Sequence, residues 1–119
     1  MTNLVHKSGL SDAEWMQRSL DGARSDPIGM WQMVRAGREG FGLSGAPLED
    51  FVQRFITEMI TGGAEPIVGD DAAEFGWISA DRPGGSPKET AEALVEEWTR
   101  SGVDPDVDGV WFAFPQVWK

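Results

Sequence analysis

The 119-residue chain contains no cysteine and only one histidine, His6. The missing cysteines exclude disulfide bonds, thiolate metal ligands and cysteine nucleophiles. A histidine metal site usually needs more than one histidine, and His6 lies near a terminus, where chains are usually mobile. The sequence therefore predicts no catalytic role for His6, no metal centre built on histidine, and no cofactor.

Long hydrophobic runs are also missing. No segment approaches the roughly 20 apolar residues that a membrane-spanning helix needs. The N-terminal stretch MTNLVHKSGL lacks the apolar core of a signal peptide, and a cysteine-free composition is compatible with a reducing compartment. We therefore expect a soluble cytoplasmic protein without a membrane partner.

Common motifs of enzymes are absent as well. The sequence has no G-x-x-x-x-G-K-[ST] phosphate loop and no G-x-S-x-G nucleophile elbow. The glycine-rich stretch GREGFGLSG, residues 37–45, follows a predicted helix and not a strand, so we interpret it as a loop between helices. These absences favour a protein that is not an enzyme.

What the chain has in excess is negative charge. It carries 20 acidic and 10 basic residues, a net charge of −10. Residues 61–119 hold 12 acids and 4 bases, a balance of −8, whereas residues 1–60 hold 8 acids and 6 bases, a balance of −2. Such a surface repels phosphate backbones, so we expect no direct nucleic-acid binding, and it attracts basic proteins. The alternative is that the carboxylates serve solubility alone.

The aromatic composition is unusual, with six tryptophans, six phenylalanines and no tyrosine. Tryptophan is enriched at the centre of binding interfaces, but it is also a large core residue. The stretch MWQMV, residues 30–34, could form an adaptable binding groove, whereas its helical spacing is typical of a core. The sequence leaves open which tryptophans are exposed.

The N-terminal half, about residues 11–62, is predicted to be helical. A first helix is capped by Ser11 in a Ser-x-x-Glu box, and a second begins at DPIGMW, with Asp26 as the cap and Pro27 in the first turn. A third covers PLEDFVQRFITEMI, residues 47–60, in which apolar residues recur at steps of three and four. This wide apolar stripe is expected to face the core.

The C-terminal half, about residues 66–118, predicts a strand, a helix and a strand. The strands are EFGWIS, residues 74–79, and GVWFAFP, residues 109–115, and the helix between them is capped by Ser86 in SPKE. Both faces of the second strand are apolar, which is typical of a central strand covered on both sides. A third strand would come from EPIVG or from a partner chain, and an exposed edge would allow a homodimer. We therefore predict one α+β domain over residues 1–119, in which the helical half packs on a small β-α-β unit.

The segment VDPDVDGVWF, residues 103–112, starts like a calcium-binding loop. The aspartates at its first three ligand positions are Asp104, Asp106 and Asp108. Gly109 stands at the turn position, but Pro115 occupies the twelfth position, where such a loop needs a glutamate. We therefore interpret the segment as a turn from a helix to a strand and keep it only as a weak calcium candidate.

For function, we predict an acidic protein-binding module that docks on a basic protein surface. Small acidic inhibitors of nucleic-acid-handling enzymes, immunity proteins and phage inhibitors among them, work on this physical basis. This comparison of charge favours a bacterial or phage inhibitor. The carboxylates expected to meet the partner are Glu92, Glu96, Glu97, Asp104, Asp106 and Asp108. On an exposed helix such charges otherwise serve solubility.

Two alternatives stay open at the level of sequence. A small hydrolase-type enzyme would use a carboxylate cluster formed by Asp70, Asp71, Glu74 and the loop at residues 104–108, since these acids gather in the same half of the chain. A weak calcium-binding module would use the three aspartates of that loop, completed by a carboxylate from residues 70–74. The missing nucleophiles and the single histidine make the enzyme the weaker hypothesis.

Overall fold

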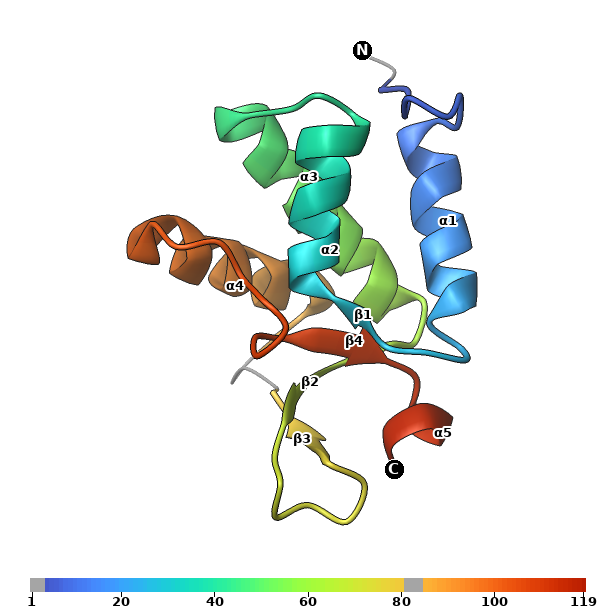
Figure 1. Ribbon diagram of the computed structural model, residues 1–119, viewed down its shortest axis with the longest axis vertical. Coiled ribbons are helices and arrows are strands. Elements are labelled where there is room, and N and C mark those ends of the chain that lie inside the picture. The colour runs from blue at the N-terminus through green and yellow to red at the C-terminus, as the bar shows by residue number, and fades with distance from the viewer. Residues whose placement is uncertain (1–3, 81–84) are drawn as a thin grey trace.

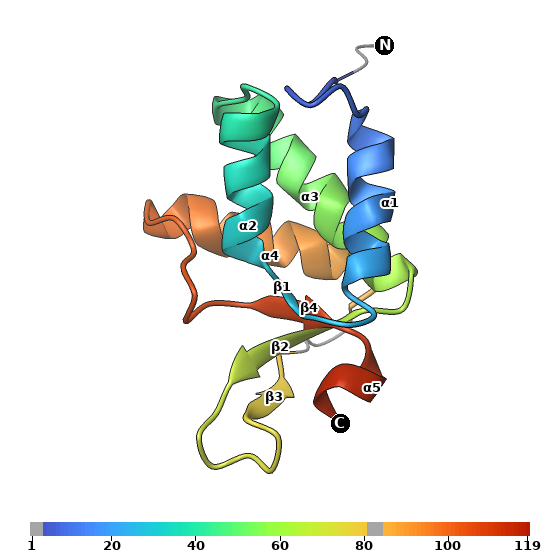
Figure 2. The same ribbon diagram turned by 45° about the vertical axis from the view of Figure 1, so that its right-hand side comes forward.

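The computed structural model describes residues 4–80 and 85–119. Its helices are α1 (Asp12–Gly22), α2 (Met30–Arg35), α3 (Gly45–Thr61), α4 (Pro87–Ser101) and α5 (Pro115–Trp118), and a π-helix, η1 (Ala36–Gly40), continues α2. Its strands are β1 (Ile28–Gly29), β2 (Glu65–Gly69), β3 (Trp77–Ser79) and β4 (Trp111–Ala113). Helices α1 to α4 lie on one side of the small sheet and α5 lies on the other (Figures 1 and 2). The fold is α+β, as predicted.

The strands form one sheet in the order β1-β4-β2-β3, in which each neighbouring pair is antiparallel. Because β3 and β4 are both antiparallel to β2, they run parallel to each other, and α4 connects them. The predicted β-α-β unit is therefore present, with β2 inserted between its two strands. β2 is the EPIVG segment that the sequence offered as a third strand.

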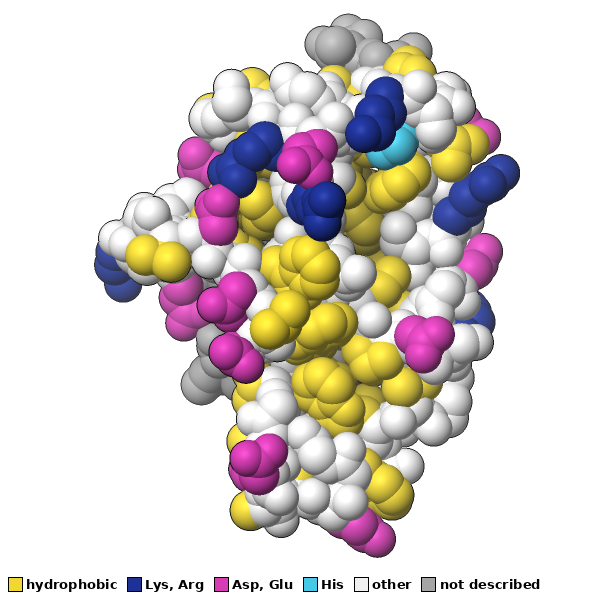
Figure 3. Space-filling model, in the orientation of Figure 1, with side chains coloured by type: hydrophobic (Ala, Val, Ile, Leu, Met, Phe, Trp, Pro, Cys, Tyr) yellow, Lys and Arg dark blue, Asp and Glu magenta, His cyan; other side chains and the backbone are white. Residues whose placement is uncertain are grey.

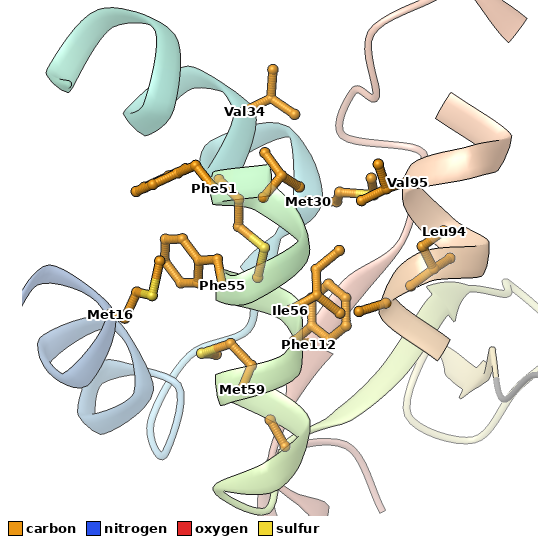
Figure 4. Packing of buried hydrophobic residues seen from close by; sticks show 14 of the residues in the cluster. Met16, Met30, Val34, Phe51, Phe55, Ile56, Met59, Leu94, Val95 and Phe112 are labelled. Carbon is orange, nitrogen blue, oxygen red and sulfur yellow. The ribbon is translucent and has the colours of Figure 1, made fainter. Parts of the chain in front are cut away.

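The main core is built on the apolar stripe predicted for α3. Its buried residues are Leu48, Phe51, Val52, Phe55, Ile56 and Met59. Figure 4 shows Phe55 next to Met16 of α1, and Ile56 next to Phe112 of β4. Leu94 of α4 closes the same cluster. None of the helices within the described ranges is long and apolar enough to cross a membrane.

β4 confirms the prediction of a central strand with two apolar faces. Phe112 is fully buried in the main core. Its neighbours Trp111 and Ala113 belong to a second cluster, together with Ile67 of β2 and Trp118 of α5. Since successive residues of a strand point to opposite faces of the sheet, β4 joins the main core to a smaller apolar layer beneath α5.

The predicted start of the second helix is wrong. Asp26 and Pro27 precede β1, and α2 begins only at Met30. The reason is that β1 pairs with β4, so the chain makes strand hydrogen bonds up to the Met30 amide. The N-cap of α2 is Gly29, which has no side chain to cap the first turn. Oε1 of Gln32 reaches back and accepts a hydrogen bond of 2.8 Å from the Gly29 amide.

The prediction that residues 37–45 form a loop is wrong for the first part of this segment, because residues 37–40 belong to η1. α2 continues into η1, whose wide turn is closed by a hydrogen bond of 3.0 Å from the Phe41 amide to the Ala36 carbonyl. Residues 40–45, GFGLSG, match the letters of the dinucleotide-binding turn G-x-G-x-x-G. They follow a helix here and not a strand, so they lack the context on which that motif depends.

Candidate functional site

A row of three tryptophan side chains crosses one face of the molecule. Trp31 comes from α2, Trp111 from β4 and Trp77 from β3. The ring centroids of Trp31 and Trp111 lie 6.4 Å apart and those of Trp111 and Trp77 lie 5.9 Å apart, both in edge-to-face contact. Such contacts hold aromatic rings in fixed relative orientations. All three side chains are half-buried, and we call this set the tryptophan row.

The sheet register explains why Trp77 and Trp111 lie together. Trp111 pairs with Ile67, and Trp77 pairs with Gly69 two residues further along β2. Residues two apart on a strand point to the same face, so both indoles stand on the face opposite the main core. Gly69 has no side chain, which leaves the space beside Trp77 open.

Trp31 reaches the row because β1 ends in a glycine. Gly29 pairs with Trp111, and the chain turns into α2 directly afterwards. A Cβ atom on Gly29 would lie 2.5 Å from Cδ1 of Trp31, far closer than packed atoms allow. Any larger residue at position 29 would therefore push Trp31 out of the row.

The turn at residues 104–109, which we call the acidic turn, runs along the Trp77 end of the tryptophan row, the lower end in Figure 1. The indole Nε1 of Trp111 donates a hydrogen bond of 2.8 Å to the carbonyl of Val107. Val107 is 60% exposed. A pocket of about 310 Å³ opens here, lined by Gly69, Asp71, Trp77, Val107 and Asp108. The structure thus brings Asp108, a predicted partner-binding residue, to the tryptophan row together with Asp71.

Asp104 has a different setting from Asp108. Its carboxylate accepts two hydrogen bonds from Arg38 of η1, at 2.6 and 3.3 Å, and one of 3.1 Å from the indole of Trp98. The hydrogen bond from Arg38, followed by that from Trp98, lowers the pKa of Asp104. The negative charge of Asp104 is therefore already paired with an arginine of its own chain, and this ion pair connects the acidic turn to η1.

Asp106 shapes the turn. Its Oδ1 accepts a hydrogen bond of 2.9 Å from the Asp108 amide, and its carbonyl accepts one of 3.0 Å from Gly109. These are the bonds of the turn that the sequence predicted. Within residues 4–80 and 85–119 the structure gathers no group of three or more acidic or histidine side chains suited to a metal ion, and Asp104 is engaged by Arg38.

The predicted partner-binding glutamates are exposed on α4, away from this pocket. Glu92 lies 3.9 Å from Lys88, and Glu96 forms an ion pair with Arg100. Glu97 is also exposed. None of the three lines the pocket beside the tryptophan row, so the structure divides the six predicted carboxylates between α4 and the acidic turn.

The carboxylates considered for an enzyme are only partly brought together. Asp71 and Asp108 line one pocket. Asp70 accepts a hydrogen bond of 2.9 Å from the Ala72 amide and shapes the turn after β2. Glu74 is exposed in the same turn and is not among the residues that line the pocket.

The sequence predicted that His6 lies on a mobile terminus. In the structure its side chain is buried. Its ring stacks on Trp15 with centroids 3.9 Å apart and meets the edge of Phe41 at 5.2 Å. Its Nδ1 accepts a hydrogen bond of 2.9 Å from the Ser8 amide. The N-terminal segment is therefore anchored by packing, and His6 has a structural role.

The ion pair of Asp104 yields a prediction for stability. We expect Asp104→Asn to lower the free energy of unfolding by about 0.5–1 kcal/mol at neutral pH, because both side chains of the pair are about half exposed and solvent screens them. The pKa of Asp104 is lowered in the folded protein. The stabilisation is therefore present above the ordinary aspartate pKa of about 3.9 and is lost as the pH falls through the lower folded value.

Urea unfolding at neutral pH and at about pH 2 measures this difference. The two proteins should differ in stability at neutral pH and converge in acid. Asp26→Asn, at an exposed position before β1, is the matched control and should leave stability unchanged at both pH values. A loss in Asp104→Asn that persists in acid would contradict the ion-pair explanation.

The position of the tryptophan row could not be predicted from the sequence. Tryptophan abundance was visible, but the row joins residues from three elements through the register of β1, β2 and β4. The one available indication was the alternation in residues 109–115, which placed Trp111 on the face opposite Phe112.

No family model, no curated protein and no solved structure matches this chain. The tryptophan row and the acidic residues beside it are therefore the features on which a function can be based.

Proposed function

We propose that this chain is an acidic protein-binding module that docks a basic protein surface onto the tryptophan row. The observation that carries the proposal is the row itself, three half-buried indoles in edge-to-face contact on one face. Figure 3 shows a continuous hydrophobic patch down the middle of this face, over α2 and β4. Exposed apolar patches with a polar rim are typical of protein interaction sites.

The geometry of the row suits an interface centre. Tryptophan is the residue type most enriched among interface residues that dominate binding energy. The three rings are already held by one another and by the Trp111–Val107 hydrogen bond, so a partner loses little free energy in ordering them. A docked surface would remove their remaining exposed area from water, which is the main source of affinity in such interfaces.

Charge indicates which kind of partner fits. Acidic side chains flank the lower half of the patch and basic ones lie above it (Figure 3). At the upper end Trp31 shares a pocket with Lys7 and with Arg35, which is paired with Glu39 of the same pocket. At the lower end Trp77 shares a pocket with Asp71 and Asp108 and with no basic residue. A basic partner would therefore place its cations at the Trp77 end.

The α4 glutamates have a separate part in this proposal. They lie outside the pocket and two of them have local ion pairs, so they add to the long-range field and not to the contact. Such a field raises the association rate with a basic protein and weakens as salt is added. A protein that handles nucleic acid has the kind of basic surface these charges fit, which favours an inhibitor or immunity-type role.

The proposal is tested with purified basic nucleases and DNA-binding proteins as a panel, measured by surface plasmon resonance. For the member that binds, Trp77→Ala and Trp31→Ala should each raise the dissociation constant about 30-fold or more, the usual size of a hot-spot loss. Ile78→Ala is the matched control, because Ile78 is 42% exposed on the same strand as Trp77 and points to the other face of the sheet; it should leave the dissociation constant within about threefold. The folding of each variant is checked by thermal unfolding.

Four results would count against the proposal. The first is that no basic protein of the panel binds. The second is binding that is unaffected by the row substitutions, and the third is an association rate that is indifferent to salt. The fourth is self-association that depends on Trp77 and Trp31, measured by analytical ultracentrifugation, because a second copy of the chain would then be the occupant.

A further inference from the structure

The pocket at the lower end of the tryptophan row has a composition that suits a cation. We infer that this pocket, which we call the Asp71–Trp77–Asp108 pocket, receives the guanidinium group of one arginine of the docking partner. The inference rests on the proposed function, since it names the side chain that anchors the basic partner. The pocket has a volume of about 310 Å³ and combines two carboxylates with one indole.

Guanidinium chemistry matches these groups. A planar guanidinium can stack on an indole face, and its fork of N–H donors pairs with carboxylate oxygens. Gly69 forms the floor beside Trp77, and a Cβ atom there would meet only the Gly76 carbonyl, at 4.0 Å. The floor therefore leaves room for a flat group to lie against the indole.

Two other carboxylates of this chain that lie near an indole are each paired with a cation, and at one of them the cation also lies over the ring. Arg38 is held by Asp104, whose carboxylate also accepts a hydrogen bond from Trp98. Lys119 lies over the Trp118 ring at 5.0 Å and 3.2 Å from Glu65. In both places a carboxylate beside an indole is paired with a cation.

The Asp71–Trp77–Asp108 pocket is without such a cation in the part of the chain that the structure describes. The ion pairs between described residues use neither Asp71 nor Asp108. Both carboxylates are exposed, and Val107 beside them is 60% exposed. The two carboxylates that would hold an arginine therefore have no ion-pair partner among the described residues and are open to a docking protein.

The alternative cation, lysine, fits less well. An ammonium group is a compact, strongly hydrated point charge, whereas a guanidinium is planar and weakly hydrated. Two carboxylates and an indole offer a planar guanidinium group more favourable contacts than a compact ammonium group. The inference is therefore specific to arginine.

The test uses the whole chain and N-acetyl-arginine amide as the probe, followed by ¹H–¹⁵N NMR. Saturable shifts are expected at the Trp77 indole N–H and at the amides of Gly69 and Asp108, with a dissociation constant on the order of millimolar for so small a ligand. N-acetyl-citrulline amide, which has the same shape without the charge, should give no saturable shift. N-acetyl-lysine amide should bind several-fold more weakly.

Charge-matched variants separate the pocket from general acidity. Asp71→Asn with Asp108→Asn should abolish the saturable shifts, whereas Glu92→Gln with Glu96→Gln removes the same charge from α4 and should leave them intact. Equal shifts with citrulline, or shifts that are lost equally in both double variants, would overturn the inference. Thermal unfolding shows whether each variant is folded.

A failure of the arginine pocket can be distinguished from a failure of the proposed function. If the probe fails to bind while a basic protein still docks through Trp31 and Trp77, the arginine pocket is wrong and the protein-binding proposal stands. If the probe binds as expected while no basic protein of the panel docks, the pocket binds a guanidinium group, but the protein-binding proposal fails and the partner's arginine fails with it.

Discussion

Replacing Phe112 with alanine is expected to lower the free energy of unfolding by about 3–5 kcal/mol. The side chain is fully buried, and β4, which carries it, lies between β1 and β2 in the sheet. Figure 4 shows it beside Ile56 of α3. Alanine removes the whole ring, so the loss combines the hydrophobic transfer energy with the cost of the cavity.

A loss of this size is a large share of the total stability, since a domain of this kind has about 5–15 kcal/mol in all. Urea unfolding followed by tryptophan fluorescence measures it. Phe75→Ala is the matched control, because Phe75 is 58% exposed in the turn before β3, and should change stability by less than about 0.5 kcal/mol. Equal losses at the two positions would mean that β4 is not the centre of the core.

The central place of β4 is also the part of the fold that the sequence predicts best. Residues 109–115 are apolar at every other position and also at the positions between, a pattern typical of a strand covered on both faces. The stripe of α3 is predicted equally well, because its helical period alone identifies the buried face. These patterns are local, so the sequence displays them directly.

Features that depend on pairing between distant segments could not be predicted in the same way. The pattern Asp26-Pro27 normally starts a helix, yet the next residues form β1, which pairs with β4. The two strands are distant in sequence, since Ile28 pairs with Phe112, more than eighty residues further along the chain. A short strand of two residues has no recognisable period of its own. Its existence follows from the strand beside it, which a single-sequence pattern does not reveal.

The candidate site shows the same division between local and distant information. The acidity of the second half was evident from composition, but the roles of individual acids were not. Asp104 is paired with Arg38 across a separation of 66 residues, while Asp108, four residues later, lies open beside Trp77. Identical residue types in one turn thus have different roles, because the elements packed on either side of the turn differ.

The packing of His6 against Gly40 gives the second large prediction. A Cβ atom on Gly40 would lie 2.4 Å from Cδ2 and Nε2 of the His6 ring. The ring cannot move away easily, because it is stacked on Trp15 and bonded to the Ser8 amide. We therefore expect Gly40→Ala to cost about 1–3 kcal/mol of stability, the usual range for overpacking.

The strain in Gly40→Ala should also loosen the N-terminal segment. The Lys7 amide donates a hydrogen bond of 2.9 Å to the Gly40 carbonyl, so hydrogen exchange at Lys7 reports on this contact. Exchange there should become faster than in the parent protein, while amides of β4 change only by the global loss of stability. Gly22→Ala is the matched control, because nothing lies within 4 Å of a Cβ at Gly22, and should be neutral or slightly stabilising.

The partner of Gly40 in this contact is identified by a double-mutant cycle. His6→Ala alone should destabilise, since it removes the stacking on Trp15. In combination with Gly40→Ala it also removes the ring that the new methyl group would strike. The loss of unfolding free energy in the double variant should therefore be smaller than the sum of the two single losses by about 1 kcal/mol or more. Strictly additive losses would show that the cost of Gly40→Ala arises within η1 itself and not from contact with His6.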